Sequence, residues 1–242
     1  MNNKTLLCCL PAILGAPLFG AYASGKEIPK SGNDGKAGRP NVLFLLTDDQ
    51  TFSTIQAWGN TDIHTPNMDR LVRHGVSFTQ THVMGGFNGA ISQPSRAMLL
   101  TGRGLMDVHR NGGVIPEAEK TFPELFRENG YTTFATGKWH SDNASFNRSF
   151  STGANIFFGG MHPYGRNNEL GHRRPYLHQY DPAGNYNNSN GVWVDASRET
   201  FSSELYADAA IGFLETASSD NAPFLMYVAF TSPHDPRNVL PG

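Results

Sequence analysis

The sequence predicts an α/β fold with a mostly parallel central sheet flanked by helices. Two short apolar runs, NVLFLL at residues 41–46 and FLMYVAF at residues 224–230, are typical of strands buried on both faces. Between them, helical patterns alternate with a further strand, as in parallel βαβ units. With 242 residues, the chain is long enough for one domain with a sizeable core.

The other elements are predicted from local signals in chain order. Thr65 and Pro66 open a helix that ends near His74, with Gly75 as its C-cap. Further expected elements are a strand at 77–83, helices at 94–100 and 122–128, a strand at 131–136 and an amphipathic helix at 204–214. Between residue 141 and about residue 198 the pattern is lost, and a loop of that length usually carries function or insertions.

The first residues have the pattern of a secretory signal peptide. Lys4 precedes a mostly apolar run at residues 6–19, and Ala21-Tyr22-Ala23 is an A-x-A cleavage pattern. The apolar run is shorter than the roughly 20 residues that a membrane span requires. We therefore predict an exported, periplasmic or secreted protein with no membrane segment in its mature form.

The predicted leader, residues 1–23, also contains both cysteines of the chain, Cys8 and Cys9. A lipoprotein anchor at either cysteine is the alternative interpretation, but no small residue precedes Cys8. The mature chain would contain no disulfide, thiolate metal site or cysteine nucleophile. Residues 24–38 are rich in Gly, Ser and Lys and are expected to form a flexible linker before a catalytic domain at residues 39–242.

The charge composition argues against a nucleic-acid partner. The formal net charge is −2, and charged residues make up 17% of the chain. Proteins that bind nucleic acid through the phosphate backbone usually carry a strongly basic surface. We expect an ordinary globular protein whose partners are not nucleic acids.

Unusual polar residues follow three of the expected strands. In open α/β sheets, ligands bind beyond the carboxyl ends of the strands. The three clusters are Asp48–Asp49 after the 41–46 strand, Lys138–His140 after the 131–136 strand and His234–Asp235 after the 224–230 strand. We therefore expect these clusters to meet at one rim of the sheet and to form a site.

The adjacent carboxylates of Asp48 and Asp49 suggest a metal site. Two neighbouring carboxylates repel each other, and a cation between them relieves that cost. Oxygen ligands suit a hard cation such as Ca²⁺ or Mg²⁺. The alternative is a solvated turn after the strand.

Ser92 stands two residues before Pro94, which is expected in the first turn of a helix. One interpretation is an N-cap. The other is a reactive position, because a helix N-terminus favours an anion beside it. Arg96 would add a planar cation suited to oxyanions, although a surface salt bridge is its alternative role.

Lys138 and His140 are two residues apart on a segment expected to be extended, so both side chains should face the same side. A lysine can neutralise an oxyanion and a histidine can move a proton near neutral pH. Trp139 should point the other way, into packing. His234 stands between Pro233 and Asp235-Pro236, and this rigidity suits a positioned acid or base, although a packing role is the alternative.

At these residues the sequence resembles the sulfatases of the alkaline phosphatase superfamily. The matching segments are Pro40–Val42 with Thr47–Gln50, Thr65–Leu71, Ser92–Arg96 with Leu100–Arg103, Gly137–His140 and Ser232–His234. Among them the Ser-x-Pro-x-Arg pentapeptide followed by Thr-Gly-Arg is the most specific. The resemblance implies an alkaline-phosphatase-like fold and sulfuric ester hydrolysis.

The resemblance also implies that Ser92 is converted after translation to formylglycine by a sulfatase-maturating enzyme, and that this serine-type conversion takes place in bacteria. A metal, Ca²⁺ rather than Mg²⁺, would be held by Asp48, Asp49 and the formylglycine. Arg96 would stabilise the aldehyde hydrate, and Lys138 and His140 would bind the sulfate. His234 would protonate the leaving alcohol.

The resemblance further implies two more metal ligands, an Asp and an Asn or His, from a later strand. No candidate for them precedes Gly242, so we expect the C-terminal part of the fold to be missing from this chain. The leader and the loop His172-Arg173-Arg174 favour a sulfated carbohydrate, glycan or glycosaminoglycan, as substrate. Two alternatives stay open: a phosphate-ester hydrolase of the same superfamily, and an inactive truncated sulfatase fragment.

Overall fold

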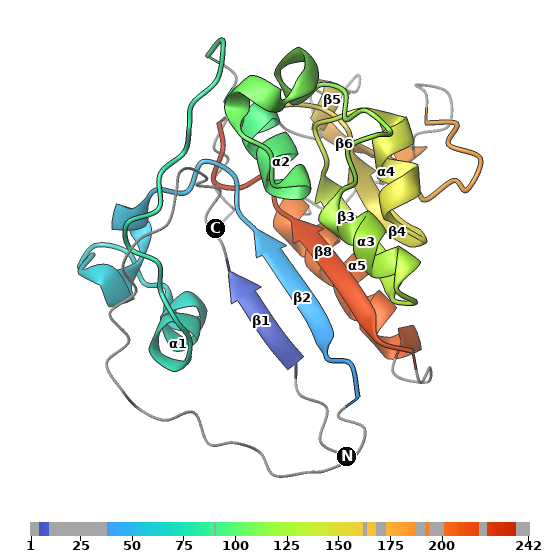
Figure 1. Cartoon of the computed structure of the whole chain (residues 1–242). Coiled ribbons are helices and arrows are strands. Elements are labelled where there is room, and N and C mark those ends of the chain that lie inside the picture. Colours follow the sequence, from blue (N-terminus) through green and yellow to red (C-terminus); the bar gives the residue numbers. More distant parts are fainter. Residues whose placement is uncertain are drawn as a thin grey trace.

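The computed structural model describes residues 5–9, 38–89, 91–161, 164–167, 173–186, 192–193, 201–217 and 222–235. A five-stranded sheet with the order β1-β2-β8-β3-β4 forms its centre, and every neighbouring pair is parallel (Figure 1). The strands are β1 (Thr5–Cys9), β2 (Asn41–Leu46), β3 (Thr132–Lys138), β4 (Thr152–Phe157) and β8 (Phe224–Ala229). The mostly parallel sheet predicted from the sequence is therefore confirmed.

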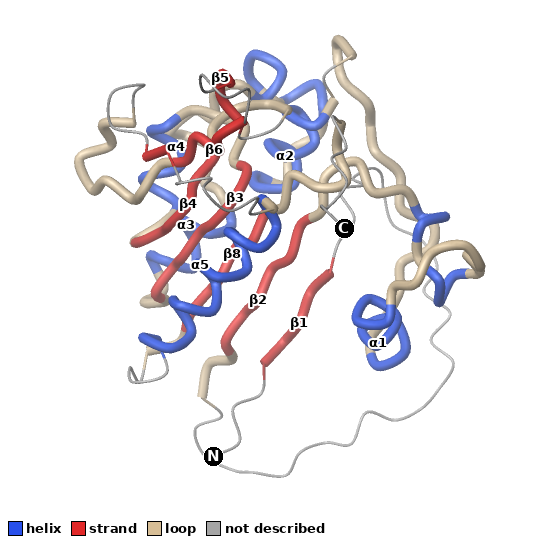
Figure 2. Tube along the Cα trace, turned by 180° about the vertical axis from the view of Figure 1, so that it is seen from behind, coloured by secondary structure: helices blue, strands red, loops and turns tan. Residues whose placement is uncertain are grey.

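Helices cover both faces of this sheet. The α-helices are α1 (Pro66–His74), α2 (Ser92–Thr101), α3 (Phe122–Glu128), α4 (Asn143–Ser149) and α5 (Ser202–Ala217). Short 3-10 turns are η1 (Phe52–Thr54), η2 (Gln56–Trp58), η3 (Leu105–Asp107) and η4 (His109–Gly112). Figures 1 and 2 show α2, α3 and α4 on one face and α5 on the other.

Two apolar clusters hold the layers together. Alternate side chains of a strand point to opposite faces, so Phe44 and Leu46 of β2 pack toward α2 while Leu43 and Leu45 pack toward α5. All six residues of β8, the central strand, are buried. This explains why its sequence is a continuous apolar run, as expected for a parallel strand covered on both faces.

A small antiparallel sheet lies beyond β4. It consists of β5 (Tyr164–Asn167), β6 (Arg173–Leu177) and β7 (Val192–Trp193). Reciprocal backbone hydrogen bonds between Ile156 and His178, of 2.7 and 2.8 Å, join it to the central sheet. The side chains of the predicted carbohydrate-binding loop at 172–174 lie outside the described residues.

Most predicted elements are confirmed, with small shifts at their ends. The helix at 122–128 has the predicted bounds, and its Thr121 and Glu124 form a capping box. The strand predicted at 131–136 begins at Thr132 and continues to Lys138, so that Lys138 is the last strand residue rather than the first loop residue.

Two predictions were wrong. Residues 77–83 form no strand: Phe78 is 72% exposed, and none of the strands in the described part of the chain pairs with this segment. The segment from 141 onward is not a featureless loop, because α4 and β4 lie within it. Asp142 caps α4 by accepting a hydrogen bond of 2.8 Å from the Ser145 amide.

The β1 edge differs from the rest of the sheet. β1 lies inside the predicted signal peptide, whose cleavage stays a prediction, and pairs in parallel with β2. Nearby, α1 packs against η2 and not on the sheet (Figures 1 and 2). Buried Asp69 of α1 makes this contact, because its Oδ1 accepts hydrogen bonds from the Ala57 amide and the Thr65 hydroxyl.

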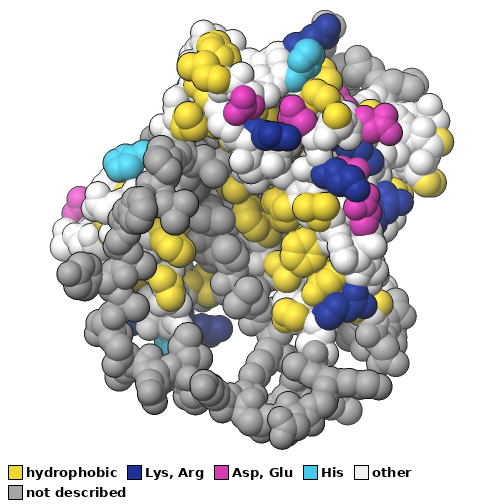
Figure 3. Space-filling view, in the orientation of Figure 1, with side chains coloured by type: hydrophobic (Ala, Val, Ile, Leu, Met, Phe, Trp, Pro, Cys, Tyr) yellow, Lys and Arg dark blue, Asp and Glu magenta, His cyan; other side chains and the backbone are white. Residues whose placement is uncertain are grey.

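The surface on the α3 side carries both apolar and charged side chains. Figure 3 shows hydrophobic side chains across the middle of this face, near β2 and α3, and charged side chains above and beside them. No helix within the described ranges is long and apolar enough to cross a membrane.

Candidate active site

The loops that follow β2 and β8 run side by side at the carboxyl rim of the sheet. The Phe230 amide donates to the Leu46 carbonyl at 2.8 Å, and the Asp48 amide donates to the Ser232 carbonyl at 3.1 Å. These bonds continue the strand pairing beyond the strand ends. Since β3 borders β8 on its other side, Lys138 at the end of β3 reaches the same rim.

The Lys138 ammonium group is at the centre of the site. It donates to Asp48 Oδ2 at 2.5 Å, to Ser92 Oγ at 3.1 Å and to the Gly160 carbonyl. These three acceptors use all three of its N–H groups. The side chain is fully buried, and that burial, followed by the nearby Arg96, lowers the pKa of Lys138. The ammonium is therefore fixed in position.

Arg96 adds a second buried cation beside the first. The residue is 1% exposed, its Nη1 donates to the Lys138 carbonyl at 2.7 Å, and its Nη2 lies 3.6 Å from Asp48 Oδ1. Asp48 is thus the carboxylate shared by two buried cations. This cluster carries excess positive charge, and an oxyanion is the natural partner for such a site.

Ser92 is the first residue of α2 and does not cap it. The N-cap is Ile91, whose carbonyl accepts from the Ser95 amide at 3.1 Å. The Ser92 hydroxyl instead shares a 2.9 Å hydrogen bond with His140 Nδ1 and accepts from Lys138. The N-cap interpretation of Ser92 is therefore wrong, and its oxygen faces the two side chains predicted to accompany it.

His140 reaches Ser92 in a different way from the one predicted. We expected an extended segment, but His140 has a φ of 67°, a left-handed conformation that is uncommon outside glycine. Gln93 stabilises this conformation, because its Nε2 donates to the His140 carbonyl at 3.2 Å. Trp139 packs in the core against Phe146, as expected.

Burial, followed by the neighbouring cations Lys138 and Arg96, lowers the pKa of His140 to about 4. The imidazole is therefore neutral near pH 7. In that form one ring nitrogen donates a hydrogen bond and the other accepts one. A neutral imidazole beside the Ser92 hydroxyl can accept a proton from that oxygen or return one to it.

Asp49 and His234 form a second, more exposed pair beside this cluster. His234 Nε2 lies 3.5 Å from Asp49 Oδ2, and the Asp49 side chain is 53% exposed. Asp49 has a φ of 57° and is, like His140, a non-glycine residue in the left-handed region. Such conformations are found preferentially at functional sites.

The oxygen donors at this rim match a hard cation in type but not in number. Asp48 and Asp49 supply carboxylates and Ser92 a hydroxyl, whereas Ca²⁺ takes six to eight oxygen ligands. Within the described residues, no cluster of three or more His, Cys, Asp and Glu side chains could hold a metal ion. Each carboxylate instead has a cationic or histidine partner, which relieves the repulsion that we expected a metal to relieve.

Sequence reasoning missed two backbone features of the site. Gly137 has a φ of 89°, and a Cβ there would lie 1.9 Å from the Ala229 carbonyl oxygen, so only glycine permits this approach of β3 to β8. Gly160, at the end of the loop after β4, supplies an acceptor for Lys138. The Gly159-Gly160 pair was the available signal, but nothing in the sequence indicated which strand end it would face.

Comparisons with known proteins show which proteins this chain is similar to. Arylsulfatase G of Mus musculus is 30% identical over 260 residues, covering 93% of this chain and 45% of the relative. The N-acetylglucosamine-6-O-sulfatase of Bacteroides thetaiotaomicron is 31% identical over 214 residues, covering 84% of this chain and 32% of the relative. The chain thus spans less than half the length of these relatives.

Solved structures show the same fold. One, in complex with its substrate D-glucosamine-2-N,6-O-disulfate, has a TM-score of 0.58 at 26% identity and covers 82% of this chain and 35% of its own. The Ps i-CgsB protein in complex with k-i-k-neocarrahexaose has a TM-score of 0.60 at 26% identity, covering 82% and 46%. These likenesses confirm the predicted alkaline-phosphatase-like fold. Since the family model described as Sulfatase matches residues 40–241, the chain belongs to the sulfatase family.

Proposed function

We propose that this chain is the N-terminal catalytic part of a hydrolase that cleaves sulfate from a sulfated carbohydrate. The observation that carries the proposal is the contact of one hydroxyl, Ser92 Oγ, with both Lys138 and His140 in a buried cluster with excess positive charge. An oxyanion bound there would meet fixed cations in a setting of low dielectric, where they stabilise charge strongly.

Each side chain of the cluster would have its own role in the reaction. Lys138 would bind a sulfate oxygen next to the attacking atom by exchanging one of its three present acceptors for that oxygen, since its ammonium lies 3.1 Å from Ser92 Oγ. His140, neutral near pH 7, would move a proton at that same oxygen. Arg96 holds the Lys138 carbonyl and so fixes the end of β3, while its charge adds to the anion attraction.

His234 would give a proton to the oxygen of the leaving alcohol as the sulfur–oxygen bond breaks. Asp49 lies 3.5 Å from its Nε2 and is half exposed, so the pair borders the solvent side from which a sugar would enter.

We further propose that Ser92 is oxidised to formylglycine by a sulfatase-maturating enzyme, losing two hydrogens. The aldehyde would supply, as its hydrate, a hydroxyl group that attacks sulfur. The placement of Ser92 at the start of α2, free of a capping role, supports this assignment. The predicted leader and the serine-type conversion together support a location in a bacterial periplasm or outside the cell.

Asp48, Asp49 and the modified Ser92 would contribute oxygen ligands to a divalent metal, Ca²⁺ in preference to Mg²⁺. Such an ion would polarise the sulfate and offset its charge. The remaining ligands would have to come from residues other than the described ones, which supply too few.

The names of relatives support a sulfated sugar as substrate. An N-acetylglucosamine-6-O-sulfatase is among the similar proteins, and two similar structures hold a disulfated glucosamine and a neocarrahexaose. The chain matches less than half of each of them, so the choice of sugar and of sulfate position is a property of the whole protein.

The decisive experiment is mass spectrometry of the Ser92 peptide after expression with a sulfatase-maturating enzyme. We expect the mass of the peptide to fall by that of two hydrogens. When the aldehyde then reacts with a hydrazine to form a hydrazone, the mass should rise by that of the added group. Turnover of an aryl sulfate should appear only in the matured protein. An unchanged serine in protein that nevertheless hydrolyses aryl sulfate would refute the formylglycine mechanism.

Two alternatives have their own supporting observations. The hydrogen bond between unmodified Ser92 Oγ and His140 would also suit a serine that attacks a phosphate ester. Faster hydrolysis of aryl phosphate than of aryl sulfate would favour that function. The shortage of metal ligands among the described residues would suit an inactive fragment, and a titration showing no calcium binding and no thermal stabilisation would favour it.

A further inference from the structure

Gly160 contacts both polar side chains that face Ser92. It lies three residues beyond the end of β4, whose last residue, Phe157, accepts a hydrogen bond of 2.8 Å from the Trp139 amide. That bond ties the loop after β4 to the segment that joins Lys138 and His140. Gly160 is thereby held against the site although it is distant from Ser92 in the sequence.

The backbone of Gly160 orients the Lys138 ammonium. The Gly160 carbonyl accepts one of its three N–H groups, while Asp48 and Ser92 accept the other two. Lys138 has flexible methylene groups, and an ammonium with only two acceptors could rotate or shift. The third acceptor therefore keeps a strong donor directed at Ser92 Oγ.

The missing side chain of Gly160 makes room for His140. A Cβ at residue 160 would lie 2.8 Å from His140 Nε2 and 3.3 Å from its Cε1. The ring has little freedom to move, because Gln93 donates a hydrogen bond to the His140 carbonyl and the Ser92 hydroxyl is hydrogen-bonded to Nδ1 on the other edge of the ring. Any side chain at residue 160 would press the imidazole out of its contact with Ser92.

We propose that Gly160 is a positioning residue of this site, which sets the Lys138 ammonium with its carbonyl and the His140 ring with its lack of a Cβ. The inference rests on the proposed function, since both side chains matter only if Ser92 is the reacting position. It assigns catalytic importance to a glycine that carries no reactive group.

The test compares Gly160→Ala with Gly159→Ala in the matured protein. Gly159 is a matched control because a Cβ there would also be crowded, at 2.5 Å from Phe157 Cζ, but the crowding atoms are not site atoms. For Gly160→Ala we expect kcat for an aryl sulfate to fall by about 10- to 100-fold with little change in KM, as for a misplacement of about 1 Å. Gly159→Ala should change kcat by less than about 3-fold when both proteins are folded.

A double-mutant cycle with His140→Ala separates positioning from general damage. In a protein that already lacks the ring, Gly160→Ala should have almost no further effect on kcat, and any loss of thermal stability caused by the collision should be recovered. Additive losses of kcat, or no recovery of stability in the double variant, would overturn the proposal.

A crystal structure of unmatured Gly160→Ala tests the geometry without any turnover. We expect the distance from His140 Nδ1 to Ser92 Oγ to exceed about 3.5 Å, beyond hydrogen-bond range. An unmoved ring would overturn the proposal. If the parent protein hydrolyses no sulfate ester, the proposed function fails by itself, and this structural comparison still decides the role of Gly160.

Discussion

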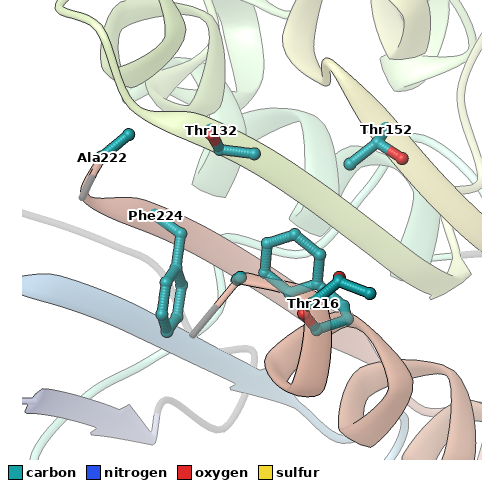
Figure 4. Close-up of a pocket in the computed structure, with 7 residues that line it drawn as sticks. Thr132, Thr152, Thr216, Ala222 and Phe224 are labelled. Atoms are coloured by element: carbon teal, nitrogen blue, oxygen red, sulfur yellow. Dashed lines mark hydrogen bonds between the residues drawn. The ribbon is translucent and has the colours of Figure 1, made fainter. Parts of the chain in front are cut away.

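The two ends of the central sheet differ: an uncharged cavity lies at the amino end of the strands, and a cluster of buried charges lies at the carboxyl end. At the amino end, a cavity of about 220 Å³ lies between the sheet and α5 (Figure 4). Its lining contains no charged side chain and consists of Thr132, Thr152, Phe213, Thr216, Ala217, Ala222 and Phe224. At the carboxyl end, Lys138, Arg96 and Asp48 are almost completely buried and in mutual contact. The candidate site for an anion lies among these buried charges, and the uncharged cavity lies at the other end of the sheet.

The polarity of parallel strands explains the difference. At the carboxyl ends, the chain passes into loops that can bring side chains from neighbouring strands together, and α2 begins there. The opposite, amino end of the sheet contains the first residues of three strands, Thr132, Thr152 and Phe224. If this contrast is functional, changes at the two ends should have very different effects on turnover.

The largest effect is expected from removing the Ser92 hydroxyl. Ser92→Ala should lower kcat/KM for aryl sulfates by at least about 10⁴-fold, because the reacting group is lost. Thermal unfolding should change little, since Ser92 does not cap α2. The matched control is Thr132→Val, which removes a hydroxyl from the amino-end cavity and should leave turnover within about 2-fold. Equal losses of activity in the two variants would abolish the distinction between the two ends.

A smaller but still large effect is expected from Asp48→Asn on stability. The substitution leaves two buried cations, Lys138 and Arg96, without their carboxylate, at a cost of about 3 kcal/mol in the free energy of unfolding. Chemical denaturation measures this change. Adding Lys138→Met should recover part of the loss, because one unpaired cation is then removed.

The surface pair Lys120–Glu128 is the control for this prediction. Its nitrogen and oxygen are also 2.5 Å apart, but both side chains are about half exposed. Solvent screens such pairs, so Glu128→Gln should have a much smaller effect than Asp48→Asn. Similar losses at the two pairs would mean that the buried cluster does not have the low dielectric that the proposed function requires.

A third effect is the dependence of stability on pH. The folded-state pKa of His140 is about 4, below its ordinary value of 6.5, so the unfolded chain takes up a proton first as the pH falls. The contribution of neutral His140 is fully present above pH 6.5 and is lost as the pH falls toward 4. Between pH 7 and pH 5 we expect a loss on the order of 1 kcal/mol after allowing for partial exposure.

His140→Asn should lose less stability over the same pH range, and the difference between the two curves isolates this residue. His178, whose pKa is also lowered by burial, contributes equally to both curves and cancels. Parallel curves for the parent and the variant would show that His140 is solvated and is not held in the buried cluster.

The sequence was informative where chemistry is concentrated and weaker where geometry depends on remote contacts. The apolar runs of β2 and β8 and the residues at their carboxyl ends were predicted correctly, because composition and strand polarity determine them locally. The left-handed backbone of His140 was not predicted, because it depends on Gln93 and on the loop after β4. The strand β4 was missed because Gly153 and Asn155 hide its pattern.

The smallest effect is expected at the amino end of the sheet. Thr152→Ile keeps a β-branched residue at the start of β4 and replaces the hydroxyl with an ethyl group, a net gain of one carbon atom beside the cavity (Figure 4). Filling this space should raise the free energy of unfolding by up to about 0.8 kcal/mol, the value of one buried methylene. Turnover of aryl sulfate should stay within about 2-fold of the parent, because no side chain that lines the cavity contacts Lys138 or Ser92. A marked loss of turnover without a loss of stability would mean that the uncharged cavity binds a ligand or is coupled to the active site. The functional distinction between the two ends of the sheet would then be wrong.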